Sequence, residues 1–363
     1  MGSSGVVRVV VHLLFALFVL NIALIVLARR QNSGAWIAYT AFIEGRSELF
    51  LMTGDGDSVR RISQRSLCGA NPRWSPDGEW IAFVSRCTNS DDVYLMRPGG
   101  ALVNLSSAPN STGTPRWSPD GRHLVAVCCR ISSLYLIDVQ ANRQRRLANS
   151  YMTPNWSPDG EWIYAFPLFK PDSALERVHV TTGRAERVLP AQASLTIPHW
   201  SPDGGRIVLG LPTESGDELF IMPAEGFTLE AVPIDLPFSH VRAPVWSPDG
   251  EWIAFLGGEP FAWHVYRVRP DGRNFERLSQ QTGNHDSFHW SPDGEWLLFS
   301  ADYDGGTNIY RLRADGSVMQ KLAPGSGPQY APTSPRERFS APLVMLALAL
   351  GGAIFSRKWV ALV

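Results

Sequence analysis

The sequence carries almost no excess of charge of either sign and has few cysteines. Lys and Arg number 33 against 34 Asp and Glu, a formal net charge of −1, so there is no electrostatic reason to expect a nucleic-acid partner. Four cysteines are too few for a disulfide-built fold, and their spacing matches no zinc pattern. The sequence also lacks a G-x-S-x-G elbow, an H-E-x-x-H motif, a Walker loop and a dinucleotide fingerprint. We therefore expect no catalytic residue, no metal and no cofactor.

Long uncharged segments are rare in the sequence, and the first lies near the N-terminus. Val9–Ala28 contains only His12 and Asn21 as polar residues. As a helix with a rise of about 1.5 Å per residue, it would cross a hydrocarbon core of about 30 Å. The alternative is a cleaved signal peptide with Val26 and Ala28 at positions −3 and −1, although the segment exceeds the usual apolar region of about 7–15 residues.

A second uncharged segment, Pro342–Phe355, lies near the C-terminus and is followed by Arg357 and Lys358. It is short for a membrane span, but the flanking basic residues and Trp359 could extend it. The alternatives are a strand remnant or a tail helix. We expect a transmembrane anchor in residues 1–30, a globular domain in residues 31–340 and a second transmembrane segment in residues 341–363, with membrane lipid contacted by both helices.

One pentapeptide, WSPDG, recurs at a nearly constant period and determines the expected fold. It starts at Trp74, Trp117, Trp156, Trp200, Trp246 and Trp290, with spacings of 43, 39, 44, 46 and 44 residues. The short apolar runs around each copy are typical of strands. Ser-Pro-Asp-Gly suits a hairpin, because Pro presets φ, Asp bonds to the turn backbone and Gly takes the left-handed conformation. Each unit therefore predicts four strands, A to D, which is typical of a propeller blade.

The number of units predicts seven blades. Second (B) strands begin at Trp36, Trp80, His123, Trp162, Arg206, Trp252 and Trp296. The seventh A strand is missing from the WSPDG series, and we expect it 43 residues beyond Trp290, with Thr333 in the place of Trp. The fold class is then all-β: a seven-bladed β-propeller of four-stranded blades, its last blade closed by a C-terminal strand A with N-terminal strands B–D, and flanking transmembrane helices. Six blades with splayed ends are the alternative.

The six WSPDG copies resemble those of the TolB-type propeller family, a relative of WD-repeat proteins. The resemblance covers roughly residues 35–335. It implies a propeller and export from the cytoplasm. Members of the TolB family carry an α/β domain ahead of the propeller, and we expect none before Trp36. Similar repeats form the propeller of prolyl-oligopeptidase-like enzymes, in which a separate hydrolase domain performs the chemistry.

The phase of the repeat predicts how the propeller is held. The break in the closing blade falls at the A–B turn, so both apolar segments should leave from one point on the face that carries the Ser-Pro-Asp-Gly turns. The basic residues flanking the two segments do not determine the orientation. From the family resemblance we expect the protein at the cell membrane, with the propeller outside the cytoplasm.

The residue before each motif Trp should lie on the innermost strand and face the central axis. These residues are Arg73, Arg116, Asn155, His199, Val245 and His289. Five of the six are polar, and we name them as candidate ligand-binding residues because charges that ring a narrow channel focus their field on an anion. The alternative is that these polar side chains only contact water in a hydrated channel.

The loops whose sequences do not follow the repeat provide the other candidate ligand-binding residues. They carry Phe169, Phe261 and Trp263, which we take as exposed interface anchors on the face away from the membrane. The alternative is that these aromatic residues cap the ends of blades. We expect a non-catalytic scaffold for a protein or glycan; the alternative is a hydrolase or lyase with its site at the channel mouth.

Two further local patterns have a structural interpretation. If Trp74 faces Trp80, then Cys68 and Cys87 lie within one residue of facing positions and could form a disulfide, or both could be free thiols in the cytosol. Asp302–Gly306 resembles part of a calcium loop but lacks the remaining ligand positions, so we interpret it as a hairpin loop.

Overall fold

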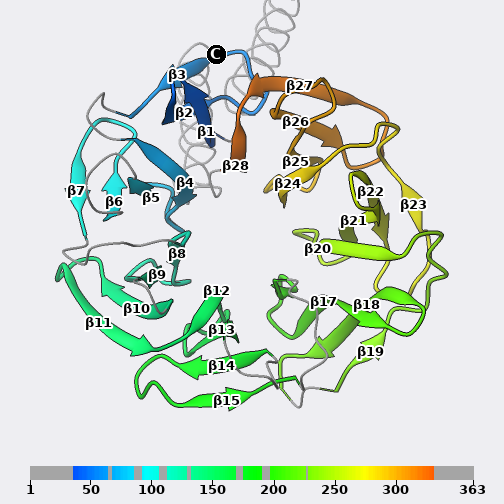
Figure 1. The fold of residues 1–363 in the computed structure, drawn as a ribbon, viewed down its shortest axis with the longest axis horizontal. Helices are drawn as coiled ribbons and strands as arrows, with labels where there is room; N and C mark the ends of the chain where they lie inside the picture. Colours follow the sequence, from blue (N-terminus) through cyan, green and yellow to red (C-terminus); the bar gives the residue numbers. More distant parts are fainter. Residues whose placement is uncertain are drawn as a thin grey trace, which may run out of the picture.

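The computed structural model describes residues 36–63, 68–85, 92–105, 113–128, 132–168, 175–189, 197–225 and 228–330. These residues form seven four-stranded antiparallel sheets, arranged as blades around a central axis (Figure 1). The predicted seven-bladed, all-β propeller is therefore confirmed, and the six-bladed alternative is wrong.

The strands follow the order A to D from the axis outward in every blade (Figure 1). Blade 1 consists of β28 (Ser326–Tyr330), β1 (Ile37–Ile43), β2 (Arg46–Met52) and β3 (Val59–Arg61). Blade 2 consists of β4 (Gly69–Trp74), β5 (Ile81–Ser85), β6 (Asp92–Met96) and β7 (Leu102–Asn104). Blade 3 consists of β8 (Arg116–Trp117), β9 (His123–Cys128), β10 (Ser133–Asp138) and β11 (Arg143–Ala148).

The remaining four blades have the same composition. Blade 4 consists of β12 (Tyr151–Trp156), β13 (Trp162–Pro167), β14 (Glu176–His179) and β15 (Ala185–Arg187). Blade 5 consists of β16 (His199–Trp200), β17 (Arg206–Thr213), β18 (Gly216–Pro223) and β19 (Glu230–Ala231). Blade 6 consists of β20 (His240–Trp246), β21 (Ile253–Glu259), β22 (Ala262–Val268) and β23 (Glu276–Arg277). Blade 7 consists of β24 (His285–Trp290), β25 (Trp296–Ala301), β26 (Asn308–Arg313) and β27 (Met319–Pro324).

The ring closes where β28 pairs antiparallel with β1, as the phase of the repeat predicted. Ile37 lies opposite Tyr330, just as Ile81 lies opposite Trp74 in blade 2. Tyr330 therefore takes the place of the motif Trp, and the expectation that Thr333 does so is wrong. The error came from assuming a constant period, because the last spacing is three residues shorter than the 43 assumed.

The Ser-Pro-Asp-Gly segments form the hairpin turns that the sequence predicted. In blade 2 the Ser75 hydroxyl donates to Asp77 at 2.5 Å and accepts the Trp80 N–H at 2.9 Å, while Asp77 accepts the Glu79 N–H. Gly78 has a φ of 70°, which an L side chain rarely adopts. The same serine contacts recur at Ser118, Ser157, Ser201, Ser247 and Ser291. Each motif carboxylate is therefore a turn former.

The register of the innermost strands differs from the expected one. Trp74 lies opposite Ile81 and not Trp80, and a β-bulge between Ala70 and Arg73 shifts the pairing by one residue. The bulge places Asn71, three residues before the motif Trp, at a φ of 56°. Equivalent positive φ values occur at Thr153, Ala243, Ser287 and Gly327.

The core consists of apolar clusters between adjacent blades. Ile81, Phe83 and Val84 of β5 are fully buried, because a B strand packs both of its faces on neighbouring blades. This explains why the B strands read as continuous apolar runs. One such cluster joins Ala82 of blade 2 to Leu124 of blade 3.

Three of the six motif tryptophans, Trp117, Trp156 and Trp290, also link successive blades through their indole N–H groups. Trp117 donates to the Arg73 carbonyl at 3.0 Å, and Trp156 donates to the Arg116 carbonyl at 3.0 Å. Each acceptor belongs to the residue before the motif Trp of the preceding blade. At these three positions Trp has a structural role that the sequence analysis missed, since a Phe could fill the space but could not donate this bond. The indole N–H groups of Trp200 and Trp246 are buried and have no partner among the described residues.

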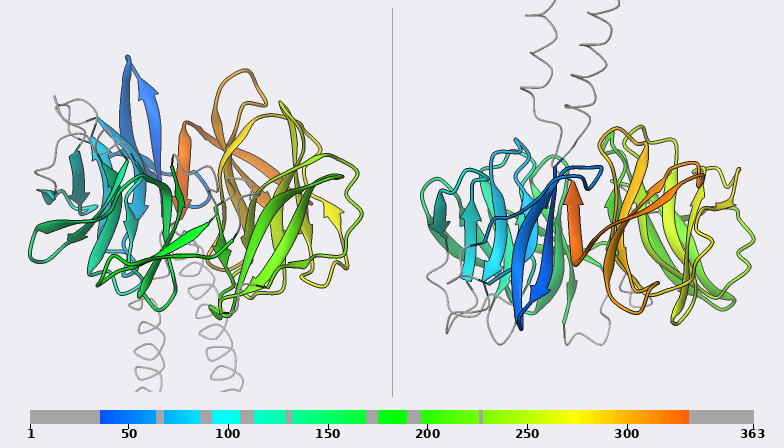
Figure 2. Two further views of the ribbon diagram at one scale, coloured as in Figure 1. Left: turned by 60° about the horizontal axis from the view of Figure 1, so that its bottom comes forward. Right: turned by 90° about the horizontal axis from the view of Figure 1, so that it is seen from above.

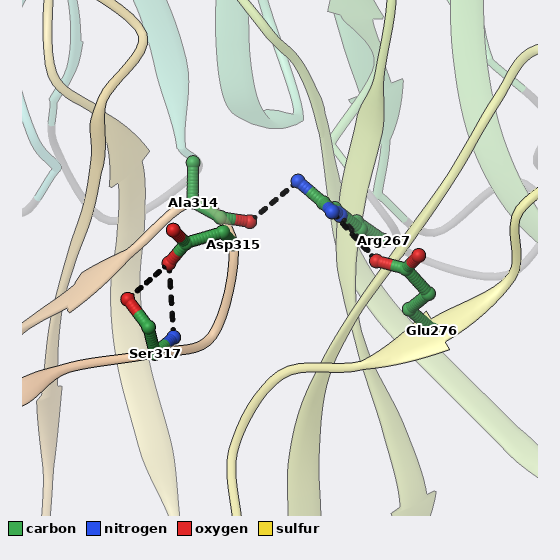
Figure 3. Close-up of polar contacts among 5 residues, drawn as sticks. All are labelled: Arg267, Glu276, Ala314, Asp315 and Ser317. Atoms are coloured by element: carbon green, nitrogen blue, oxygen red, sulfur yellow. Dashed lines mark hydrogen bonds and ion pairs between the residues drawn. The ribbon is translucent and has the colours of Figure 1, made fainter.

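Arginines on the outer part of the blades provide a second link. Arg267 of β22 donates to Glu276 of β23 and, through Nη1, to the Ala314 carbonyl of blade 7 at 2.7 Å (Figure 3). Arg311 of blade 7 repeats this arrangement and donates to the Gly54 carbonyl of blade 1 at 2.6 Å. The second contact therefore bridges the blades at which the ring is closed.

Both ends of the described chain lie at one face of the ring. β28 runs toward this face and β1 starts from it, as their pairing requires (Figure 2). Within the part that the structure describes, no helix has the length and hydropathy of a membrane span. The predicted membrane segments, Val9–Ala28 and Pro342–Phe355, lie outside the described residues.

Candidate functional site

The innermost strands surround the axis of the ring and carry the candidate residues at equivalent positions (Figure 1). Arg73, Arg116, His199 and His289 are half-buried there, and we call the axial space that they face the central channel. Each precedes the motif Trp and lies opposite the second or third residue of the B strand, as Arg73 lies opposite Ala82 and Arg116 opposite Val125. The set comprises Arg73 on β4, Arg116 on β8, Asn155 on β12, His199 on β16, Val245 on β20 and His289 on β24. By register with Ala38, the seventh position belongs to Gln329 on β28, which the sequence analysis missed because it placed this strand three residues too late.

Four of these residues act on one another electrostatically across the channel. Burial lowers the pKa of His289 well below its ordinary value, and the charges of Arg73, Arg116 and His199 lower it further. These residues belong to blades 2, 3, 5 and 7, which do not all adjoin one another around the ring. Their positions on the innermost strands place the four residues around the axis, and this interaction agrees with that placement.

The imidazoles of the channel are neutral at neutral pH, whereas the guanidinium groups are charged. Burial lowers the pKa of His199 to about 4, and the charge of Arg116 contributes in the same direction. Burial also lowers the pKa of Arg116, but an arginine remains protonated at neutral pH. Among the described residues, no carboxylate forms an ion pair with Arg116.

Two members of the set have structural contacts that restrict their roles. The Asn155 amide donates to the Pro198 carbonyl at 3.1 Å, which links blades 4 and 5. Nδ1 of His199 accepts the Trp246 N–H at 3.2 Å. Because Nδ1 accepts, the proton of this neutral imidazole lies on Nε2, which is therefore a donor. In His289, Nε2 is buried and has no hydrogen-bond partner among the described residues.

The face opposite the chain ends carries the aromatic candidates; we call it the distal face, and it includes the β1–β2 and β21–β22 hairpin tips (Figure 2). Phe261 lies at the β21–β22 tip and is 78% exposed. Trp263 is only 4% exposed and packs in the cluster between blades 6 and 7, so the expectation of an exposed anchor there is wrong. Phe169 lies outside the described residues.

A second exposed aromatic residue on the distal face escaped the sequence analysis. Phe42 lies near the tip of the β1–β2 hairpin and is 75% exposed, and its neighbour Ile43 is 43% exposed. The signal was present in the sequence, because Phe42 and Ile43 directly precede the Glu-Gly turn. It was overlooked because the B strand of blade 1 begins with an ordinary apolar run.

A buried polar pair lies at the same end of blade 7. Nδ1 of His285 donates to the Gly283 carbonyl at 2.9 Å. In the neutral imidazole Nε2 then carries no proton and accepts from the Tyr303 hydroxyl at 2.6 Å. Burial lowers the pKa of His285 to about 4 and raises the pKa of Tyr303. Both groups are neutral and bonded to each other at neutral pH, which suits a structural contact better than proton transfer.

The Asp302–Gly306 segment is a hairpin loop, as interpreted from the sequence. Asp302 accepts the Asn284 N–H at 2.7 Å and its side-chain amide at 2.8 Å. Asp304 accepts from Tyr310 and Lys321. Across the described part of the chain, no group of three or more His, Cys, Asp or Glu side chains could hold a metal.

The cysteine prediction is partly outside the described residues. Cys68 is disulfide-bonded, and Cys128 is a buried thiol. The two candidate partners of Cys68 within the chain, Cys87 and Cys129, lie outside the described residues, so the Cys68–Cys87 pairing stays a prediction. The register is compatible with it, since Gly69 lies opposite Ser85.

The closed ring of seven four-stranded sheets, with its repeated Trp-Ser-Pro-Asp-Gly turns and axial channel, defines the class of protein as a β-propeller. The family model described as the TolB beta propeller domain (PD40) matches residues 38–164 and 234–346. The chain therefore belongs to the TolB beta propeller domain family.

Similar proteins agree with this assignment. The Tol-Pal system protein TolB of Desulfosudis oleivorans is 32% identical over 59 residues, which is 16% of this chain and only 14% of that protein. TolB from Acinetobacter baumannii has a similar structure, with a TM-score of 0.56 and 16% identity over 82% of this chain and 66% of that one. An oligogalacturonate lyase in complex with manganese has a TM-score of 0.64 and 13% identity over 76% of this chain and 85% of that one. At these identities the structural likeness shows the fold alone.

Proposed function

We propose that this protein is a membrane-tethered, non-catalytic propeller that acts as a protein- or glycan-binding scaffold outside the cytoplasm. Its partner would bind to the distal face. The observation that carries this proposal is the state of Phe261, which is exposed and at the same time held in an unfavourable backbone conformation.

In the propeller without a partner, both the exposure of the Phe261 side chain and its backbone conformation are energetically unfavourable. Its side chain is 78% exposed, and its φ of 69° is rare for a bulky residue. A glycine would relieve the backbone and remove the exposed ring. A strained residue at a loop tip suggests a function that offsets its cost, and aromatic side chains are common interface anchors.

Phe42 provides the second contact point in this proposal. It lies in blade 1 and Phe261 lies in blade 6, so blade 7 separates them (Figure 1). A partner that covers both would span three blades. This width favours a protein over a glycan among the two candidate partners, because protein interfaces are broad and use aromatic side chains as anchors.

The position of the chain ends supports a tether on the other face. Tyr330 lies opposite Ile37, so membrane helices in residues 1–30 and 341–363 would place the bilayer on that side and leave the distal face open. Deleting residues 341–363 should leave a folded propeller in the membrane fraction, held by the first anchor. Release of the propeller by this deletion alone would contradict a double anchor.

A hydrolase or lyase site at the channel mouth, the alternative function, has no specific observation in its favour. The His285–Tyr303 pair lies at the distal end of blade 7, and its hydrogen bonds are satisfied within blade 7 and its entry loop.

The experiment compares capture of partners by the full-length protein in detergent with capture by the Phe42→Ser and Phe261→Ser variants. Val318→Ser is the matched control, because Val318 is 40% exposed and lies in the β26–β27 turn on the opposite face. We expect a protein retained by the wild type and by Val318→Ser and lost from the two Phe variants. Equal retention by all four proteins would overturn the distal face as the binding surface, and retention on immobilised glycans alone would exclude a protein partner.

A further inference from the structure

The channel contains a half-buried positive charge, that of Arg116, for which the described residues supply no counter-charge. Arg116 is charged at neutral pH, and no ion pair with it occurs among the described residues. A buried charge without a partner is costly to a protein, and an opposite charge placed beside it recovers much of that cost. A lumen enclosed by low-dielectric walls also focuses the field of such a charge along the axis.

Hydrogen-bond donors surround the same space. His199 carries its proton on Nε2, because Nδ1 accepts from the Trp246 backbone. Nε2 of His289 is buried and has no partner in the described chain, so it is available to donate once the ring takes up a proton. Arg73 acts on His289 from blade 2 and adds a second guanidinium to the ring.

Neutral residues complete the ring. Asn155 is engaged with the Pro198 carbonyl, and Val245 contributes no charge. The charged and titratable groups that act on His289 are Arg73, Arg116 and His199, all positive or neutral. These groups therefore attract anions and repel cations.

We propose that the channel binds one compact oxyanion, a carboxylate or a phosphate, between Arg116, Arg73 and the imidazoles of His199 and His289. Arginine matches the geometry of either group by donating two parallel bonds. The site lies in the channel and not on the distal face, so it is independent of the proposed partner surface and either can fail alone.

Binding is linked to protons in this arrangement. An anion beside His199 and His289 favours their charged forms, so each imidazole takes up a proton more readily in the complex than in the free ring. Affinity for an anion of constant charge should therefore rise as the pH falls from 7.5 to 5.5. A cation site, or a channel that is merely hydrated, would not show this dependence.

Calorimetric titration of the full-length protein in detergent tests the proposal with inorganic phosphate, acetate and, for the pH series, sulfate. We expect saturable binding of one equivalent of phosphate or acetate, and the tighter of the two identifies the kind of group that the site accepts. Arg116→Gln should weaken binding at least tenfold, whereas Arg313→Gln, on the exposed β26 end, should leave it unchanged. For sulfate, the rise in affinity at pH 5.5 should be lost in His289→Gln.

A second measurement separates a ligand-binding arginine from a structural one. Arg116→Met removes a half-buried charge that has no ion-pair partner among the described residues, so without added anion the variant should melt at the same temperature as the wild type or higher. Phosphate should then raise the melting temperature of the wild type and not that of the variant. Lack of saturable binding by the folded wild type, equal binding by Arg116→Gln, or equal protection by chloride would overturn the proposal.

Discussion

The β21–β22 hairpin allows a stringent test of the structure, because two aromatic residues two positions apart have opposite environments. Trp263 is 4% exposed and Phe261 is 78% exposed. The Trp263 ring packs between blades 6 and 7, and the Arg242 guanidinium lies 4.4 Å from its centroid. Its backbone also forms a bridge to Gly283 at the entry of blade 7. Trp263→Ala should therefore open a cavity at a blade interface.

The expected magnitudes differ by several kcal/mol. A buried Trp replaced by Ala lowers the free energy of unfolding by about 3–5 kcal/mol, and loss of the contact with Arg242 adds about 0.5–1 kcal/mol. Phe261→Ala should change it by no more than about 0.5 kcal/mol, as is usual for an exposed position. Phe261→Gly should raise it by up to about 1 kcal/mol, because glycine adopts the φ of 69° without strain.

Urea unfolding of the full-length protein in detergent, followed by near-ultraviolet circular dichroism, measures all three variants under one condition. The reasoning requires the order Phe261→Gly, wild type, Phe261→Ala and Trp263→Ala from most to least stable. A Phe261→Ala variant as unstable as Trp263→Ala would show that the hairpin tip is packed, and the argument for a binding role of Phe261 would fail with it.

Three other perturbations test different parts of the structure. Arg311→Met should lower the free energy of unfolding by about 1–2 kcal/mol, because it removes the charged donor to the Gly54 carbonyl between blades 7 and 1. The control is Arg313→Met, since the Arg313 side chain is 48% exposed, and it should cost at most about 0.5 kcal/mol. Equal losses in the two variants would refute a special role of Arg311 at the closure of the ring. His199 has a folded pKa of about 4, below its ordinary 6.5. The stability that it contributes is therefore complete above pH 6.5 and is lost as the pH falls toward 4, and the free energy of unfolding changes by about 1.4 kcal/mol per pH unit. Urea unfolding at several pH values should show a smaller pH dependence of this free energy in His199→Gln, and an unchanged dependence would contradict the assignment. Cys68→Ser should cost about 3 kcal/mol if the bond closes the loop to Cys87, and peptide mapping of non-reduced protein that finds both thiols alkylated would reject this pairing.

The repeat made the architecture predictable, but not the register of its last strand. Six copies of one turn determine blade number and strand order, since each turn specifies the same hairpin chemistry. Tyr330 and not Thr333 closes the ring, because spacing varies between blades and the decayed copy offers two plausible matches. The bulge at Asn71 was also hidden, because the equivalent positions hold Thr153, Ala243 and Ser287, which share no sequence signal for a left-handed conformation.

The two candidate sites were predictable to different degrees. Arg73, Arg116, His199 and His289 could be aligned from the motif alone, since one position in each repeat faces the axis. Which side chains are exposed on the distal face could not be predicted from the motif in the same way. The strands of a blade are buried on both faces, so alternation does not distinguish Trp263 from Phe261, and only packing against blade 7 shows which one is covered.

The central claim, that a partner binds on the distal face, is tested most directly by photo-crosslinking in intact membranes. A photoreactive phenylalanine analogue would replace Phe261 in one sample and Val318, on the opposite face, in the other. We predict a discrete crosslinked protein from position 261 that is absent from position 318 and disappears when Phe42→Ser is added. The same crosslinked species from both positions, or none from position 261 with the propeller folded, would contradict the claim.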